Sequence, residues 1–269
     1  MPELPEVEVV RRRIEQWLVG RKIAQVTTTA PSYFFVTPPA ALRKKLSGRT
    51  IVSLERRGKY LIAALDDGSH LLLHLGMTGQ LLVGATRNDR HTHLRLEFAD
   101  GGPQVSMRDV RKFGKVLLIA RGRRHARLDK LGIDALAIDG ARLHEAARSR
   151  KIPIKTLLLD QSVLAGVGNI YADEALHAAG VRPTRRSRQV TRSECDAIAA
   201  SLLRVLRSSI AAGGTTISDY VQPDGSDGSY QRVHRVYGRE GEVCRRCGGR
   251  IRRRVLGQRS AHYCPRCQA

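Results

Sequence analysis

The first residues of the chain, Met1-Pro2-Glu3, could supply a nucleophile with an acid–base partner beside it. Removal of Met1 leaves Pro2 with a free secondary amine, and an unprotonated amine attacks carbonyl carbon to give an iminium adduct. An α-amino group has a pKa of about 7.7–8.0, so part of it is unprotonated at neutral pH. Proline and glutamate at these positions are also typical of ordinary helix initiation. From these residues alone, both interpretations stay open.

Four of the five cysteines form a second constellation with chemical meaning, Cys244-x2-Cys247 and Cys264-x2-Cys267. Each pair can place two thiolates on one tetrahedral metal, and the 16 residues between the pairs suit a hairpin that returns the second pair to the first. A disulfide or redox role is the alternative, but nothing in the sequence indicates secretion. We predict one structural Zn²⁺ with no open coordination position. Cys195 is left over and is expected to be a small buried hydrophobic residue.

Two glycine-containing segments could contact nucleic acid. The run Ala165–Tyr171, with glycines at 166 and 168, predicts a tight turn that opens a helix, where backbone amides can bind an anion. A plain connection that needs glycine for its backbone angles is equally consistent. The run His74–Gly79 presents Met77 between glycines; this side chain fills a core or, if exposed, acts as a wedge that unstacks a base step.

Charge decides which class of partner fits these segments. The net charge is +22, with 47 Lys and Arg against 25 Asp and Glu, which is typical of a protein that binds a polyanion. No apolar run is long enough for a membrane span, and no signal segment opens the chain. The basic residues are not confined to one amphipathic helix, as a membrane-surface protein would require. Nucleic acid is therefore the expected partner, and no membrane.

The elements that must position these residues change character near the middle of the chain. At the N-terminus, apolar residues at 7, 10, 14, 17 and 18 have helical spacing. Short strand-like runs separated by turns then predict a sandwich or barrel; they are Ile23–Thr28, Thr50–Leu54, Tyr60–Leu65, His70–Leu75, Thr92–Phe98 and Lys115–Ile119. Residues 141–212 have a helical pattern, residues 213–230 are expected to form a mobile loop, and the segment 248–263 predicts two short strands.

Taken in order, these motifs resemble the formamidopyrimidine-DNA glycosylase family along the whole chain. The resemblance rests on Pro2–Glu8, His74–Gly79, Asp109–Gly114, Asp160 with Gly166–Tyr171, Val236–Gly241 and the cysteine finger with Gly257–Ser260. It implies an α+β multidomain fold. We expect an N-terminal β-sandwich domain with an N-terminal helix (1–133), a helical helix–two-turns–helix domain with a lesion-lid loop (134–232), and a zinc-finger β-hairpin (233–269).

The same resemblance implies a base-excision-repair enzyme of bacteria, cytoplasmic and monomeric, that acts on double-stranded DNA carrying an oxidised base or an abasic site. Pro2 would attack C1′ of the damaged nucleotide, and Glu3 would move protons at the sugar. Lys59 would donate a proton in β-elimination, and Arg259 would hold phosphate for δ-elimination. The implied supporting carboxylates are Glu6 and Glu174.

Other positions would handle the DNA itself. An enzyme that works on C1′ must extrude the nucleotide from the stack and fill the gap. The resemblance gives this void-filling role to Met77, Arg111 and Phe113. It gives contacts with the DNA backbone or the orphaned base to His91, Arg111, Lys151, Lys155 and Asn169.

The chain departs from the family pattern at two places, and two alternative functions have to be weighed. Val110 stands where the family usually has proline, and the lid-like segment 219–230 has an untypical tip. Endonuclease VIII-like enzymes, which remove oxidised pyrimidines, usually begin Pro-Glu-Gly, whereas Leu4 here favours the purine branch. A DNA-binding protein without catalysis is the alternative from another class, and Pro2, Glu3, Lys59 and Arg259 argue against it.

Overall fold

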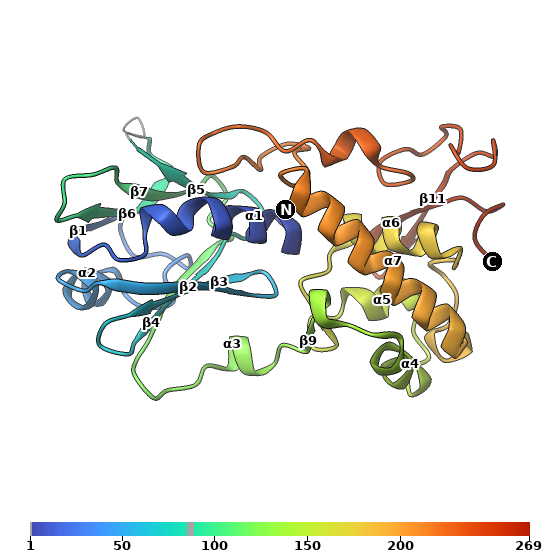
Figure 1. The fold of residues 1–269 in the computed structure, drawn as a ribbon, viewed down its shortest axis with the longest axis horizontal. Helices are drawn as coiled ribbons and strands as arrows, with labels where there is room; N and C mark the ends of the chain where they lie inside the picture. Colours follow the sequence, from blue (N-terminus) through green and yellow to red (C-terminus); the bar gives the residue numbers. More distant parts are fainter. Residues whose placement is uncertain (1, 85–88) are drawn as a thin grey trace. The chain divides into compact units, whose positions relative to one another are not determined.

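The computed structural model describes residues 2–84 and 89–269, so the expected removal of Met1 concerns a residue outside the described part. The chain forms two compact units (Figure 1). The first contains residues 1–129 and the later segment 212–229, and the second contains residues 130–211 and 230–269. The domain boundaries expected from sequence stay a prediction. None of the helices in the described part of the chain has the length and apolarity needed to span a bilayer.

Two four-stranded antiparallel sheets form the first unit, which confirms the predicted sandwich. One sheet has the order β1-β6-β7-β5, and the other has the order β2-β3-β4-β8. Their strands are β1 (Ile23–Thr28), β2 (Ile51–Arg57), β3 (Tyr60–Leu65), β4 (His70–His74), β5 (Gly79–Val83), β6 (Thr92–Phe98), β7 (Val105–Asp109) and β8 (Lys115–Ile119). The helices of this unit are α1 (Leu4–Ile14), a 3₁₀ turn (Glu15–Trp17), α2 (Pro39–Leu46) and α3 (Ala126–Asp129).

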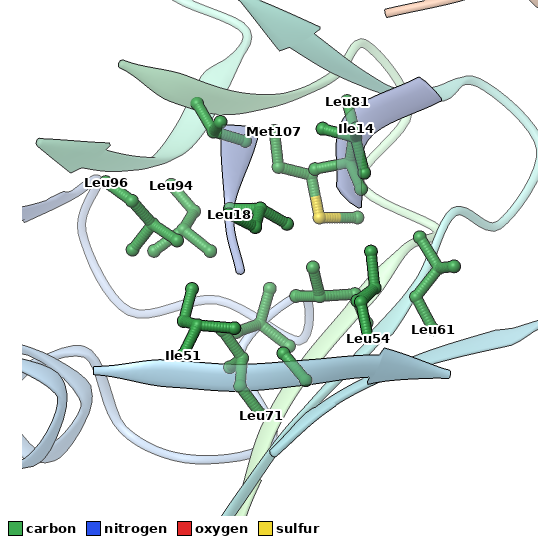
Figure 2. Close-up of a cluster of buried hydrophobic side chains, with 14 of the residues drawn as sticks. Ile14, Leu18, Ile51, Leu54, Leu61, Leu71, Leu81, Leu94, Leu96 and Met107 are labelled. Atoms are coloured by element: carbon green, nitrogen blue, oxygen red, sulfur yellow. The ribbon is translucent and has the colours of Figure 1, made fainter. Parts of the chain in front are cut away.

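The core of this unit lies between the two sheets. Figure 2 shows Leu81, Leu94 and Met107 from one sheet facing Leu54 and Leu71 from the other. Alternate residues of β3 are buried, and buried apolar residues from both sheets join one cluster, so both sheets present an apolar face. Helix α1 adds its own apolar stripe and contacts β2, β3 and β5. The start of α1 is thereby fixed against both sheets.

Helices and the zinc hairpin form the second unit. Its longer helices are α4 (Gly140–Arg148), α5 (Ile154–Leu159), α6 (Asn169–Ala179) and α7 (Arg192–Ala211). Its shorter elements are β9 (Ile133–Asp134), β10 (Leu164–Ala165) and 3₁₀ turns at Ala135–Ala137, Ser187–Gln189 and Tyr230–Val233. Cys195 is fully buried on α7, and burial, with nearby acidic residues, raises the pKa of its thiol to about 11. The prediction of a small buried residue is confirmed.

The hairpin consists of β11 (Arg252–Leu256) and β12 (Arg259–Tyr263), where two strands were predicted. Gly257 and Gln258 connect them, and both have positive φ angles, of 50° and 65°. A two-residue connection of this kind matches the twist of a hairpin, and glycine takes the first position without steric cost. Arg259 is therefore the first strand residue after the turn, and its side chain is exposed.

Candidate functional site

The N-terminal residues Pro2, Glu3 and Glu6 are buried together at the start of α1. Glu3 is the N-cap of the helix, and its backbone N–H donates to Oε2 of Glu6 at 2.8 Å in a capping box. Pro2 directly precedes this cap, so the chain end is tied to a rigid helix. Helix initiation and a chemical role are thus compatible, because the cap is the device that positions Pro2.

The second oxygen of Glu6 reaches the segment 212–229. Its Oε1 accepts the Thr215 N–H at 2.8 Å, and Gly214, with a φ of 85°, packs against the Glu6 side chain. Burial raises the pKa of Tyr220, and the Glu6 carboxylate raises it further. The segment expected to be a mobile loop is therefore tied to the helix that carries Glu3. Glu6 supports this arrangement through backbone amides on both of its oxygens.

Sequence reasoning missed an ion pair that fixes Lys59. Glu8 on α1 is nearly buried, and its Oε2 accepts from Nε of Arg56 at 3.0 Å. Burial by itself would raise the pKa of Glu8, but hydrogen bonds from Arg11, from a second α1 arginine and from Arg56 lower it. Arg56 also donates to the Gly58 carbonyl, in the turn that carries Lys59 between β2 and β3. The sequence did carry a signal for this ion pair. Glu8 lies on the same face of α1 as the buried Leu4, and an acidic residue on a buried face requires a partner.

The predicted void-filling residues come from two adjacent loops. Met77 lies between β4 and β5, and Arg111 and Phe113 lie between β7 and β8. A Cβ on Gly76 would approach the Phe113 backbone carbon to 2.5 Å, so the two loops touch. The Arg111 guanidinium stacks over the Phe113 ring at 4.5 Å, and both side chains are exposed. The structure thus brings these three residues together on one rim of the sandwich.

Asp109, at the end of β7, organises this rim from the inside. It is fully buried, and its carboxylate accepts from Thr78 Oγ1 at 2.5 Å and from the Gly114 N–H at 2.7 Å. Its backbone N–H donates to the carbonyl of His91, which is half-exposed beside the same loop. A buried carboxylate with several donors fixes the loop without a covalent link. His91 consequently joins Arg111 on this rim.

In the second unit, the helix α6 begins at Asn169 after a cap at Gly168, as the glycine turn predicted. The Asn169 Oδ1 atom has no hydrogen-bond partner within the described residues. Glu174, one turn further on, is buried, and its two oxygens accept the backbone N–H groups of Arg235, Val236 and Tyr237. Its carboxylate therefore anchors the chain that leads into the zinc hairpin.

The two lysines expected at DNA differ from each other. Lys151 is exposed ahead of α5, where a phosphate can reach it. Lys155 is fully buried, and its Nζ lies 2.7 Å from Oδ1 of Asp173 and donates to the Ser260 carbonyl at 2.5 Å. An ammonium group with no exposed surface cannot contact the DNA backbone, so this expectation for Lys155 is corrected. The residue holds α5, α6 and β12 together.

The four paired cysteines converge on one point. Their sulfur atoms all lie within 4.8 Å of one another, and the Cys247–Cys264 and Cys244–Cys267 separations are 3.5 and 3.8 Å. Tetrahedral zinc with Zn–S bonds of about 2.3 Å requires sulfur separations of about 3.8 Å. The Gly249 amide, with the neighbouring sulfurs, lowers the pKa of the Cys247 thiol to about 7, whereas burial raises the pKa values of the Cys264 and Cys267 thiols. The cluster fits one structural Zn²⁺.

Comparisons with known proteins place these features in one family. Residues 1–116 match the formamidopyrimidine-DNA glycosylase N-terminal domain, residues 131–221 match the H2TH domain of the same enzymes, and residues 241–269 match the zinc finger found in FPG and IleRS. The curated formamidopyrimidine-DNA glycosylases of Gluconobacter oxydans and Halorhodospira halophila are 42% and 43% identical, with the whole of each chain covered. The chain belongs to the formamidopyrimidine-DNA glycosylase family.

Solved structures agree with this assignment. The MutM (Fpg) protein of Thermus thermophilus superimposes with a TM-score of 0.89 at 39% identity, covering 99% of this chain and 98% of that one. The Lactococcus lactis Fpg in complex with abasic-site DNA gives a TM-score of 0.89 at 36% identity, covering 99% of both chains. The predicted fold class, with sandwich, helical domain and four-cysteine hairpin, is confirmed, as is a single structural zinc as cofactor.

Proposed function

We propose that this glycosylase excises oxidised purines from double-stranded DNA and then cleaves the strand, with Pro2 as nucleophile. The observation that carries the proposal is the buried capping box of Glu3 and Glu6, which fixes Pro2 at the start of α1 in a chain of this family. The relatives' solved complexes contain abasic-site DNA and carbocyclic 8-oxo-G DNA, which are the substrate classes that this chemistry requires. We propose that the enzyme acts as a monomer in the bacterial cytoplasm.

The first chemical stage exchanges one bond at C1′ for another. The Pro2 nitrogen attacks C1′, the bond from C1′ to the base breaks, and the base leaves with a proton. Glu3, one residue away, moves protons at the sugar so that the ring opens and the iminium forms.

The second stage breaks the DNA strand on both sides of the lost base. The iminium nitrogen accepts electrons, so the C2′ proton becomes acidic and the 3′ phosphate leaves in β-elimination. Loss of the 5′ phosphate follows in δ-elimination. We propose Lys59 as proton donor in the first elimination and Arg259 as the phosphate-holding residue in the second. Both side chains have solvent access, as groups that meet DNA must.

The nucleotide must leave the helix before C1′ can be attacked, and the exposed rim suits this task. We propose that Met77 and Phe113 fill the gap and that Arg111 faces the orphaned cytosine. Unstacking costs a few kcal/mol, which wedge insertion and phosphate contacts offset. His91, Lys151 and Asn169 are proposed to provide such contacts. Lys155 is excluded from this set by its burial.

Borohydride trapping tests the proposal directly. The full-length protein is incubated with a duplex that contains one 8-oxoguanine opposite cytosine, and the covalent adduct is mapped by peptide mass. We expect an adduct on Pro2, a loss of adduct in Pro2→Gly, and a strong loss of turnover with retained DNA binding in Glu3→Gln. Glu15→Gln, half-exposed in the 3₁₀ turn that follows α1, is the control and keeps full activity.

Three results would contradict the proposal. An adduct on a lysine in place of Pro2 would refute the proposed nucleophile. An adduct with an oxidised pyrimidine but none with 8-oxoguanine would place the chain with the endonuclease VIII-like enzymes. Tight binding of all lesions without any adduct, in protein shown by mass to lack Met1, would indicate a binding protein.

A further inference from the structure

A buried polar network joins the zinc hairpin to the helices of the second unit. Asp173 on α6 has no exposed side-chain surface and contacts two partners. Its Oδ1 lies 2.7 Å from the Lys155 Nζ, and its Oδ2 accepts from the His262 backbone N–H at 2.9 Å and lies 3.2 Å from the His262 Nδ1. Lys155 completes the network by donating to the Ser260 carbonyl. Three elements, α5, α6 and β12, meet here.

The network attaches to the free edge of β12. In the hairpin register, Arg259 pairs with Leu256, and Ser260 and His262 are the first and third residues after Arg259. In an antiparallel pair, every second residue directs its backbone groups away from the partner strand. The Ser260 carbonyl accepts a hydrogen bond from Lys155, and the His262 amide donates one to Asp173. These two side chains thus satisfy edge groups of β12 that a third strand would otherwise pair with. The strand is thereby fixed in register as well as in distance.

Stability alone is a weak reason for this arrangement. A buried ion pair often contributes no more than apolar residues of the same volume, because both charges must be removed from water. Buried ionic groups fix one geometry where an apolar contact permits several. The group that benefits is Arg259, which directly precedes Ser260 and lies at the tip of an otherwise exposed hairpin.

We propose that Asp173 is a positioning residue which, through Lys155 and His262, aims Arg259 at the phosphate that leaves in δ-elimination. The inference rests on the proposed function, in which Arg259 assists that step. Asp173 does not touch the substrate in this scheme. A displacement of about 1 Å in a catalytic group can cost about a hundredfold in rate, so a loosened β12 is sufficient to slow the step that needs Arg259.

Single-turnover strand cleavage distinguishes this role from a general structural one. With a labelled 8-oxoguanine duplex, the β-product and the β,δ-product separate on a gel, and borohydride trapping reports imine formation independently. In Asp173→Asn, we expect δ-elimination to slow by about tenfold or more while imine trapping changes less than twofold. Asp196→Asn, an exposed aspartate paired with Arg192 on α7, is the matched control and leaves both steps unchanged.

The decisive measurement repeats Asp173→Asn in an Arg259→Ala background. If Asp173 acts through Arg259, the double variant and Arg259→Ala have equal δ-elimination rates, because the effects do not add. Additive losses, or equal slowing of imine trapping and δ-elimination, would overturn the inference. Failure of the wild-type protein to form any imine would instead refute the proposed function.

A zinc assay distinguishes a loss of positioning from misfolding of the hairpin. Each variant is assayed for one zinc per chain, and His262→Gln provides a milder change that keeps the backbone N–H to Asp173. We expect it to retain zinc and to lower the ratio of δ- to β-product in the same direction. An unchanged ratio in zinc-replete His262→Gln, together with an unchanged ratio in Asp173→Asn, would show that β12 needs no such support.

Discussion

The two units hold their functional residues in place by different physical means. In the sandwich, Pro2, Met77 and Phe113 lie at the rim of a large apolar cluster to which both sheets contribute. The apolar cluster beside the hairpin that carries Arg259 is small. Within the described residues it consists of Val236, Ile251 and the four metal-site cysteines. Burial of apolar area scales with the size of the core, so a small module needs other restraints. Thiolates and a buried ion pair provide them.

This difference predicts how damage spreads. A sandwich core absorbs the loss of one side chain as a cavity and keeps its topology. A metal module has no stable alternative to its ligand set, so the loss of one ligand unfolds it. Damage to one unit should therefore leave the other unit intact.

The largest effect is expected from Cys264→Ser. Loss of one thiolate removes a binding free energy that is about 10–16 kcal/mol in small zinc-finger peptides, and the hairpin unfolds. We expect zinc to be absent and DNA affinity to fall by at least about a hundredfold, whereas the sandwich keeps its near-ultraviolet spectrum. Cys195→Ala is the control, because this buried cysteine binds no metal and its variant keeps one zinc per chain. Zinc retention in Cys264→Ser would break the proposed contrast.

A cavity in the sandwich should have the opposite distribution of effects. Leu71→Ala removes a buried side chain between the sheets and should lower the free energy of unfolding by about 2–5 kcal/mol. Zinc content and the affinity for DNA should stay within twofold, because the hairpin has a small cluster and a metal site of its own. Val52→Ala on the exposed face of β2 should change stability by less than about 0.5 kcal/mol. Denaturant unfolding with parallel zinc assays checks both variants.

A smaller change targets the contact between the two rim loops. Gly76 has a φ of 65°, and an added Cβ would approach the backbone of Phe113 to 2.5 Å. Gly76→Ala should therefore destabilise by about 1–3 kcal/mol and displace Met77 from Phe113. Gly84→Ala has a similar φ of 90° with open space around its Cβ, so it isolates the backbone cost, which is about 1 kcal/mol.

The readout for these glycine variants is the ratio of cleavage rates on 8-oxoguanine duplex and on a preformed abasic site. A displaced rim should slow the first, which needs base extrusion, more than the second. Equal slowing of both substrates by Gly76→Ala would show that the loop contact serves stability alone.

The sequence predicted best where spacing is local. The cysteine pairs, the helix start after Pro2 and the glycine turn before Asn169 each involve residues within a few positions of one another, so their geometry follows from the chain itself. Strands β5 and β7 were not among the predicted runs. Strand β5 begins at a glycine and has no alternating pattern. Strand β7 does alternate apolar and polar residues from Val105 to Arg108, but over only five positions, which is too short a run to stand out from the surrounding turns.

Ion pairs between residues far apart in the chain could not be predicted from the sequence. Glu8 pairs with Arg56 across 48 positions, and Lys155 pairs with Asp173 from a different helix. A lysine in a basic chain is expected at the surface, and only the folded arrangement of α5, α6 and β12 shows that it is buried. The family resemblance transferred a DNA-contact role to Lys155 for the same reason, since position in a motif carries no information about burial.

The smallest expected effect is a pH dependence that both units share. In the sandwich, burial, together with the positive charge of Lys59, lowers the pKa of His74 to about 4, and its Nδ1 accepts the Gly76 N–H at 3.1 Å. In the second unit, burial, together with the positive charge of Arg239, lowers the pKa of His234 to about 4, although a hydrogen bond with the Tyr237 backbone opposes this shift. Both imidazoles are therefore neutral in the folded protein at pH 7.

The sign follows from proton binding. The ordinary pKa of histidine is 6.5, so between pH 6.5 and about pH 4 these two histidines bind protons in the unfolded chain but stay neutral in the folded protein. The free energy of unfolding therefore falls as the pH falls through this window. Above pH 6.5 their contribution is constant. We expect His74→Gln to reduce the slope for the sandwich alone, because protonated His74 would also lose the Gly76 hydrogen bond that shapes the Met77 loop. Histidine titrations followed by NMR check the two pKa values separately. A folded-state pKa near 6.5 for His74 would show that neither burial nor the charge of Lys59 acts on this histidine.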